Sequence, residues 1–437
     1  MKKHTQSPYE SSKVSYKPSG IKWLGEIPQS WENVSIRSCF TESNQRCNTD
    51  SYPLLSVTIA NGIIYQDNIE NKKDISNDDK SNYKIVPLNA VAYNKMRMWQ
   101  GAVGVNTLTT GIVSPAYIVA IPNEKILPNF VSYLFKSKIM IGEFDKNSYG
   151  LCLDMNNLRY DDFRNIKIPL PPLQEQKEIA EFLDSKCEKI QNYIDKKQKL
   201  ITLLQEKKQT LINEVITKGL NPNIESKNSG IAYLGLIPHH WEVKKIKYIY
   251  KSINGFTPDT SNASYYDNFN GYDWITISDI NKKYVNESEV KVSQKYIDKF
   301  HPQVTPKGSL LYSFKLSVGL VAFAKKDIYT NEAVLSFLNT NDVDLNFLYY
   351  SSFLIQFNAK ENIYGAKLLN KELINNAFMV FPPLQEQKEI AEFLDSKVAQ
   401  INSVIEKTKK QIELVKEYKN TLINEAVCGR IKLKEVK

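Results

Sequence analysis

The sixteen residues PPLQEQKEIAEFLDSK at Pro171–Lys186 occur again, letter for letter, at Pro382–Lys397. Two further matches keep nearly the same spacing. They are TLINE at Thr210–Glu214 and Thr421–Glu425, and GIKWLGEIPQSWE at 20–32 with GIAYLGLIPHHWE at 230–242. Three matches in register indicate two copies of one unit of about 210 residues. A unit of this length can hold a complete domain, which excludes a short-repeat solenoid.

The segments between the matches, residues 33–168 and 243–380, share a pattern but few identities. Each contains several short runs rich in β-branched and aromatic residues, among them LSVT (55–58) and ITIS (275–278). Such runs predict strands. The chain is therefore expected to alternate a variable domain with a fixed segment, twice.

The fixed segments predict two long helices, at 173–217 and 384–427, because neither range contains proline or glycine. Their apolar residues follow a heptad pattern, which predicts that the helices pair as an antiparallel coiled coil with a variable domain at each end. Docking of each helix on a domain core is an alternative. The residues expected at the helix–helix interface are Leu183, Ile190, Ile194, Ile201, Leu204, Leu211, Leu394, Ile401, Ile405, Ile412, Val415 and Leu422.

The composition is that of an ordinary globular protein. The 437 residues are 42% hydrophobic and 24% charged, and the net charge is +9. A mildly basic chain suits an acidic partner such as nucleic acid. The five cysteines form no CxxC pair, and no apolar run is long enough to span a membrane. These features predict a cytoplasmic protein.

Catalytic motifs are missing from the sequence. It contains no GxxxxGK[ST] phosphate loop, no Asn/Asp-Pro-Pro-Tyr of amino-methyltransferases and no GxGxxG. We therefore expect no catalytic residue, metal site or cofactor in this chain.

Basic and polar residues in the variable segments are candidates for DNA contacts. Arg and Lys can bind guanine edges, Asn and Gln can bind adenine edges, and hydroxyls can bind phosphates. Ordinary solvated loops are the alternative explanation. The candidates are Ser56, Thr58, Asn94, Lys95, Arg97 and Gln100 in the first half, and Thr276, Ser278, Lys282, Ser313, Lys315 and Ser317 in the second. The aromatic residues of the two GI..LG.IP..WE segments are instead expected to pack the domains against the helices.

These residues resemble the DNA-specificity (S) subunits of type I restriction–modification systems. The resemblance rests on YKPSGIKWLGEIPQSWE, GIVSPAYIV, SYG and PLPPLQEQKEIAEFLD in the first half, and on GIAYLGLIPHHWE, IYG and FPPLQEQKEIAEFLD in the second. The second half has TNEAVLSFL in place of GIVSPAYIV, so we expect the two domains to differ in specificity.

The resemblance implies a non-catalytic subunit whose two mixed α/β target-recognition domains each recognise half of a bipartite, asymmetric DNA site. It implies that the helices set the half-site spacing and bind two modification subunits, and that restriction subunits join them. S-adenosylmethionine, ATP and Mg²⁺ are then expected on those partners. A coiled-coil adaptor without DNA binding, and a methyltransferase or nuclease with unrecognised motifs, are the competing hypotheses.

The expected organisation has seven parts. They are an N-terminal extension (1–19), a first recognition domain (20–172), a spacer helix (173–217), a linker (218–229), a second recognition domain (230–383), a second spacer helix (384–427) and a C-terminal tail (428–437).

Overall fold

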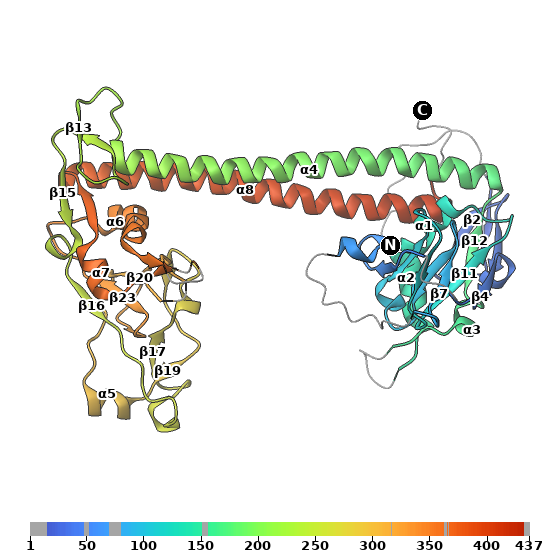
Figure 1. Cartoon of the computed structure of the whole chain (residues 1–437), viewed down its shortest axis with the longest axis horizontal. Coiled ribbons are helices and arrows are strands. Elements are labelled where there is room, and N and C mark those ends of the chain that lie inside the picture. The colour runs from blue at the N-terminus through green and yellow to red at the C-terminus, as the bar shows by residue number, and fades with distance from the viewer. Residues whose placement is uncertain are drawn as a thin grey trace, which may run out of the picture. The chain divides into compact units, whose positions relative to one another are not determined.

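The computed structural model describes residues 15–47, 52–69, 80–150, 156–315, 317–361, 365 and 367–431. They form two compact units (Figure 1). Unit 1 consists of the described residues of 1–198 and 409–437, and unit 2 of those of 199–408. Residues 1–14 of the expected extension and 432–437 of the expected tail lie outside the described residues.

Two long helices contribute to both units. Helix α4 spans Leu173–Lys218 and helix α8 spans Leu384–Val427, which matches the predicted helices to within one residue. Pro172 precedes α4, and Gly219, with φ of 75°, follows it. Glycine adopts this left-handed conformation without strain, so it ends the helix.

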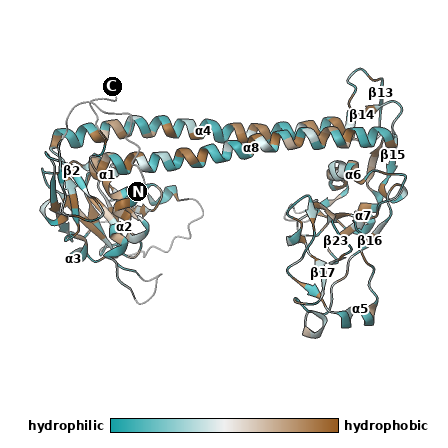
Figure 2. Cartoon of the chain, turned by 180° about the vertical axis from the view of Figure 1, so that it is seen from behind, coloured by the Kyte–Doolittle hydropathy of each residue, from teal (hydrophilic) through white to brown (hydrophobic). Residues whose placement is uncertain are grey.

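Within each unit the two helices run antiparallel, as predicted. In unit 1, Leu183 near the start of α4 shares a buried cluster with Leu422 near the end of α8. In unit 2, Leu211 near the end of α4 packs on the cluster that contains Leu394 near the start of α8. Figure 2 shows hydrophobic and hydrophilic residues alternating along both helices. This alternation is typical of helices with one buried stripe.

The structure buries or half-buries all twelve predicted interface residues. Six are buried: Leu183, Ile201, Leu394, Ile405, Ile412 and Leu422. Six are partly buried: Ile190, Ile194, Leu204, Leu211, Ile401 and Val415. The first turns of each helix also join a domain core, because Ile179 of α4 belongs to the same cluster as Trp31. Domain docking therefore occurs at the helix ends, in addition to helix pairing.

Each unit contains the same antiparallel sheet. In unit 1 the strand order is β4-β11-β8-β9, and in unit 2 it is β16-β23-β20-β21, extended by β18 at one edge. The unit 1 strands are β4 (Phe40–Ser43), β8 (Val91–Asn94), β9 (Val103–Val105) and β11 (Tyr117–Pro122). Those of unit 2 are β16 (Ser252–Asn254), β18 (Tyr284–Val285), β20 (Leu310–Ser313), β21 (Val321–Ala324) and β23 (Val334–Phe337). The shared order shows that the sequence repeat is a repeat of the fold.

Smaller elements surround these sheets. Unit 1 adds β1 (Tyr16–Pro18), β2 (Glu26–Pro28), β3 (Glu32–Ser35), β12 (Lys167–Leu170), α1 (Pro128–Lys136), α2 (Lys138–Lys146) and α3 (Tyr160–Phe163). Unit 2 adds β13 (Ser226–Asn228), β14 (Leu236–Pro238), β15 (Glu242–Lys245), β24 (Lys360–Glu361), β25 (Lys367–Leu368), β26 (Phe378–Phe381), α6 (Leu345–Ser351) and α7 (Lys371–Asn376).

The units differ most in the elements beside the sheet. Unit 1 has the hairpin of β5 (Leu55–Thr58) and β6 (Gly62–Tyr65), and the pair of β7 (Lys84–Val86) and β10 (Gly111–Val113). Unit 2 has the sheet of β17 (Tyr272–Ile275), β19 (Lys291–Val292) and β22 (Tyr329–Thr330), with helix α5 (Gln294–Phe300). These differences follow the divergent parts of the sequence.

Two predicted boundaries need correction. β1 lies in the expected N-terminal extension and β13 in the expected linker. Each pairs antiparallel with the strand of its own domain that follows it, β2 or β14, because both segments are extended and the neighbouring strand offers free backbone groups. Among the described residues no helix is long and apolar enough to cross a membrane.

Candidate nucleic-acid interface

The repeated letters at the start of each long helix attach that helix to its domain. Gln176 is fully buried. Its amide nitrogen donates to the carbonyls of Lys125 (2.9 Å) and Pro171 (2.8 Å), and its amide oxygen accepts the N–H of Leu127 (2.8 Å). Gln387 makes corresponding bonds in unit 2. A buried side chain with both ends bonded fixes the chain that enters the helix.

The tryptophan of each GI..LG.IP..WE segment bonds to the same helix start. The buried indole of Trp31 donates to Glu175 Oε2 at 2.7 Å, and that of Trp241 donates to Glu386 Oε2 at 2.8 Å. This agrees with the predicted packing role.

The end of the other helix reaches the same tryptophan. A Cβ on Gly429, which follows α8, would lie 3.1 Å from the ring of Trp31, and a Cβ on Gly219, which follows α4, would lie 3.2 Å from the ring of Trp241. Both glycines also have positive φ. Each tryptophan thus packs between the start of one helix and the end of the other.

The aspartate of EFLDSK bonds to the helix of its own domain. Tyr133 of α1 donates its hydroxyl to Asp184 at 2.6 Å, and Tyr350 of α6 donates to Asp395. Burial, followed by the hydrogen bond to the carboxylate, raises the pKa of both tyrosines. The repeated sequence therefore attaches each domain to the long helices.

Three predicted DNA contacts of unit 1, Asn94, Lys95 and Arg97, lie at the end of the sheet that is opposite to the helix attachment. We call this the loop end. It is formed by Ser43, Asn94 and Tyr117, because Tyr117 pairs with Asn94 and Ser43 pairs with Val119. The other end of β11 leads to Leu127, which is bonded to α4. The loop end is thus the part of the sheet that the helix attachment leaves open.

Three cations gather at the unit 1 loop end. Lys95 and Arg97 follow Asn94 directly, and a β-bridge pairs Arg46 with Lys84 of β7. Arg46 and Arg97 are exposed and Lys95 is partly exposed, and none of the three forms an ion pair within the described residues. Unpaired cations on loops are the groups that bind DNA phosphates and guanine edges.

Two residues beside this cluster, Lys84 and Tyr117, have shifted pKa values. Burial lowers the pKa of Lys84, which lies 3.9 Å from Glu42 and feels the positive charges of Arg46 and Lys95. Burial raises the pKa of Tyr117, opposed by its hydrogen bond with Asn94 and by the charge of Arg97. Lys84 is 6% exposed and therefore supports the surface without reaching solvent.

Sequence reasoning missed Arg46 and Tyr117. Arg46 is far along the chain from Asn94, and only the strand order brings them to one end of the sheet. The segment GIVSPAYIV could have indicated Tyr117, because Tyr117 is the first residue of strand β11 and pairs with Asn94 of β8.

The structure places the remaining unit 1 candidates differently. Gln100 is exposed at the end of the loop that follows Asn94. Ser56 is 7% exposed and donates to Gln66 Oε1 (3.3 Å), and Thr58 donates to the carbonyl of Gly62 (3.2 Å) within the β5–β6 turn. These two hydroxyls stabilise the hairpin through their internal hydrogen bonds, so they are not assigned as direct DNA contacts.

The unit 2 loop end carries different side chains. Ser313 pairs with Val334 there, at the position that Asn94 occupies in unit 1. Its hydroxyl is fully buried, donates to the carbonyl of Ser317 and accepts the N–H of Leu320 at 2.9 Å. Ser313 therefore shapes the turn and does not face a ligand. The exposed Lys315 bonds to Glu332 at 2.9 Å, and Ser317 is exposed.

The expected strand through ITIS ends earlier than predicted. β17 ends at Ile275, and Thr276 begins a 3₁₀ turn with a capping box to Asp279. The T-x-x-D spacing is typical of a capping box at the start of a helical turn. This capping box ends the strand that the alternating pattern predicts through Ser278. Thr276 and Ser278 bond to each other at 2.7 Å within this turn, while Lys282 is exposed.

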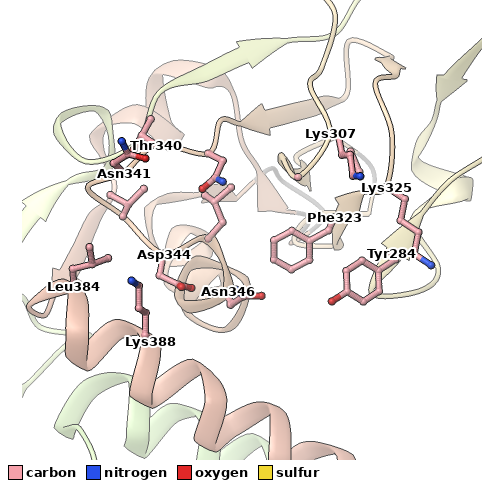
Figure 3. Close-up of a pocket in the computed structure, with 15 residues that line it drawn as sticks. Tyr284, Lys307, Phe323, Lys325, Thr340, Asn341, Asp344, Asn346, Leu384 and Lys388 are labelled. Carbon is pink, nitrogen blue, oxygen red and sulfur yellow. The ribbon is translucent and has the colours of Figure 1, made fainter.

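Three lysines surround a hollow of about 710 Å³ in unit 2 (Figure 3). Lys307, Lys325 and Lys388 are exposed and form no ion pair within the described residues. The Lys325 ammonium lies 5.4 Å from the centre of the Tyr284 ring. The carboxylate of Asp344 accepts a hydrogen bond from the N–H of Phe347. This bond caps helix α6.

Unit 1 repeats only part of this charge. Lys177 is the counterpart of Lys388 in the repeated sequence, but it lies 3.9 Å from Glu181. Asn89 and Gly308 occupy the same turn of the two sheets, with φ of 66° and 84°. The residue before them is Leu88 in unit 1 and Lys307 in unit 2. Within the described part of the chain, no three His, Cys, Asp or Glu side chains are grouped to hold a metal ion.

A repeated domain with unlike loop ends, joined by paired helices, defines the class of two-domain DNA-specificity proteins. The family model "Type I restriction modification DNA specificity domain" matches residues 28–203 and 238–414. The match covers more than half of the chain and falls once on each repeat. The chain therefore belongs to this family.

Curated relatives and solved structures agree with the family. The putative type I restriction enzyme MjaX specificity subunit of Methanocaldococcus jannaschii is 26% identical over 94% of this chain and 96% of its own. The EcoKI specificity subunit of Escherichia coli is 20% identical over 71% of this chain and 67% of its own.

Two solved structures have the same fold. A chain from work on complex assembly and conformational transition of the type I R-M system covers 93% of this chain and 99% of its own, with a TM-score of 0.71 and 17% identity. The HsdS subunit from Thermoanaerobacter tengcongensis covers 93% and 98%, with a TM-score of 0.55 and 18% identity.

Proposed function

We propose that this chain is the sequence-specific DNA-recognition subunit of a type I restriction–modification complex, and that each unit recognises one half of a bipartite, asymmetric site. The observation that carries this proposal is the loop end. The same end of the sheet carries Lys95 and Arg97 without an ion pair among the described residues of unit 1. In unit 2 it carries Lys315, which bonds to Glu332. Different side chains at equivalent positions suit two different base sequences.

The paired helices are proposed to set the distance between the half-sites. Two linked domains gain affinity only when both half-sites are present at the spacing that the link allows. A helix has a fixed rise per residue, so a continuous helix makes a better spacer than a flexible linker.

The chemistry is proposed to reside in other subunits. In this proposal, two modification subunits bind the helices and use S-adenosylmethionine to methylate adenine. Restriction subunits supply ATP-driven translocation and Mg²⁺-dependent cleavage. This chain then acts without a catalytic residue or cofactor of its own, in the cytoplasm. The full-length likeness to specificity subunits supports this division of work.

The test uses the chain assembled with the modification subunits of its own system. Methylome sequencing of a host that carries the complex is expected to reveal one modified motif with two unlike halves and a fixed gap. The purified complex is expected to bind that DNA with strong salt dependence, because bound phosphates release counterions.

Two outcomes would contradict the proposal. A complex that assembles but shows no sequence-specific DNA binding would favour the adaptor hypothesis. Methyl transfer or cleavage by the purified chain alone, given S-adenosylmethionine and Mg²⁺, would favour the cryptic enzyme.

A further inference from the structure

Lys136 is a partly buried cation of unit 1 that is bonded to three carbonyls. It is the last residue of α1, and its ammonium donates to the carbonyls of Thr58 (3.2 Å), Ile59 (2.6 Å) and Gly101 (3.0 Å). An ammonium has three N–H donors, so these bonds use all of them. Within the described residues no carboxylate forms an ion pair with it.

The three carbonyls belong to two separate segments. Thr58 and Ile59 lie in the turn of the β5–β6 hairpin, and Gly101 ends the loop that begins at Asn94. That loop contains Lys95, Arg97 and Gln100, which are candidate DNA contacts. Lys136 therefore joins the hairpin to the loop of the candidate interface.

The hairpin also packs closely on the sheet beside this bond. A Cβ on Gly104 of β9 would lie 2.7 Å from the nitrogen of Ile63 and 2.9 Å from the Cα of Gly62. No side chain fits there, so the two backbones touch. The lysine thus bonds two elements that already have one fixed contact, which leaves them little freedom to move relative to each other.

Unit 2 has no counterpart of this lysine. Leu127 and Asp344 make the same bond to the following long helix, and they precede α1 and α6 directly. Nine residues further on, unit 1 has Lys136 and unit 2 has Phe353, which packs against an apolar core. Among the described residues, a hairpin in the position of β5–β6 occurs only in unit 1.

We propose that Lys136 is a positioning residue for DNA recognition by unit 1, which holds the loop 94–101 against the β5–β6 hairpin in the conformation that recognises bases. It acts through the loop and does not contact DNA. This inference rests on the proposed function. It states that base discrimination at the half-site of unit 1 depends on the hydrogen bonds of Lys136 inside the domain.

The test compares Lys136→Met with wild type in the complex assembled with its modification subunits. Methionine keeps most of the stem and removes the ammonium. Binding is measured on DNA with single mismatches in each half-site. The variant is expected to lose on the order of tenfold in discrimination at the half-site of unit 1, since one good base contact is worth about that much. Discrimination at the other half-site is expected to stay unchanged.

Two further variants separate positioning from other roles. Lys138→Met removes an exposed lysine two residues away and is expected to change neither half-site. Lys136→Arg keeps a cation with several N–H donors and is expected to restore most of the discrimination. The salt dependence of binding should stay as in wild type for Lys136→Met, because no phosphate contact is removed.

Three results would overturn the inference: unchanged discrimination in Lys136→Met, an equal loss at both half-sites, or a salt slope that falls by about 0.9, the value for one lost phosphate contact. In each case the proposed function would stand, because wild type would still bind its bipartite site. Only a wild-type complex without sequence-specific binding would remove the proposed function itself.

Discussion

At the scale of single residues, the polar side chains of this protein divide into two groups. Gln176, Glu175 and Asp184 are bonded to their own domain and hold a helix in place. Arg46 and Arg97 are exposed and form no ion pair within the described residues, and Arg46 donates one hydrogen bond to the carbonyl of Asn82 (2.8 Å). The first group accounts for the repeated letters, and the second lies where the two halves diverge. Removing a residue of the first group should therefore change stability, and removing one of the second should change DNA binding.

Replacement of Gln176 by leucine is expected to destabilise unit 1 by roughly 2–4 kcal/mol. Leucine fits the space but leaves two carbonyls and one N–H buried without partners, and each such group costs about 1–3 kcal/mol before relaxation. The free energy of unfolding from denaturant titration measures the effect. Gln174→Leu, which removes an exposed glutamine two residues away, is the control and should change it by less than about 0.5 kcal/mol. Equal effects of the two variants would show that the buried bonds do not matter.

The stability of unit 1 is expected to depend on pH through Lys136. Burial lowers its pKa from 10.5 to about 8 in the folded chain. Between these two values the unfolded chain holds a proton that the folded chain has released, so the free energy of unfolding rises with pH. The difference between wild type and Lys136→Met should therefore shift in favour of wild type from about pH 8 to pH 10. A difference independent of pH would mean that the lysine titrates normally.

At the scale of elements, the long helices have a dual role. Their ends belong to domain cores, and residues between the ends pair with the other helix. Polar residues also occur within the heptad pattern. Thr408 is 4% exposed and donates to the carbonyl of Val404 (2.7 Å), and Lys208 donates to Asn402 (3.2 Å). Such polar positions favour one register over the apolar alternatives.

Insertion of one heptad after Lys197 together with one after Thr408 is expected to lengthen the gap between half-sites. Seven residues add about 10.5 Å of helix, which corresponds to roughly three base pairs of DNA. The paired insertion lengthens both helices equally, so their apolar residues still face each other. A single insertion lengthens only one helix and shifts its apolar residues relative to those of the other helix, which should weaken the fold. Methylome sequencing would report the new gap. A gap of the original length would show that the helices do not set the spacing.

At the scale of the whole molecule, one fold is used twice with different surfaces. The strand order of the sheet is the same in both units, while the elements beside it differ. The three-lysine hollow of unit 2 is only partly repeated in unit 1, where Lys177 corresponds to Lys388 but Leu88 corresponds to Lys307. The attachment of each domain to the helices uses the same residue types in both units, so the surface of one domain can change without affecting the other.

Exchange of residues 243–380 for the corresponding segment of another family member is expected to change one half-site only. Trp241, Glu386 and Gln387, which attach the domain to the helix start, lie outside this segment, so assembly should persist. The modified motif, read by methylome sequencing, should keep the half-site and gap of the parent on one side. The reciprocal exchange of 33–168 should change the other half-site. A change of both halves by either exchange would contradict independent recognition.

The duplication, the two long helices, their antiparallel pairing and the family could all be predicted from the amino-acid sequence. These features depend on local signals: identical letters in register, the absence of proline and glycine, and an apolar heptad. Asn94, Lys95 and Arg97 lie at one loop because they are neighbours in the chain, and their contact with DNA stays a prediction.

Which polar residues face solvent could not be predicted from the sequence and follows from the three-dimensional packing of each domain. Ser313, Ser56 and Asn94 are all polar residues of strands. The hydroxyls of the two serines are nevertheless buried and form hydrogen bonds within their own domains. Arg46 joins the loop end through strand order, and Lys136 bonds two segments that are distant in the chain. Long-range pairing and burial determine these properties, and neither is encoded in the residues next to the side chain.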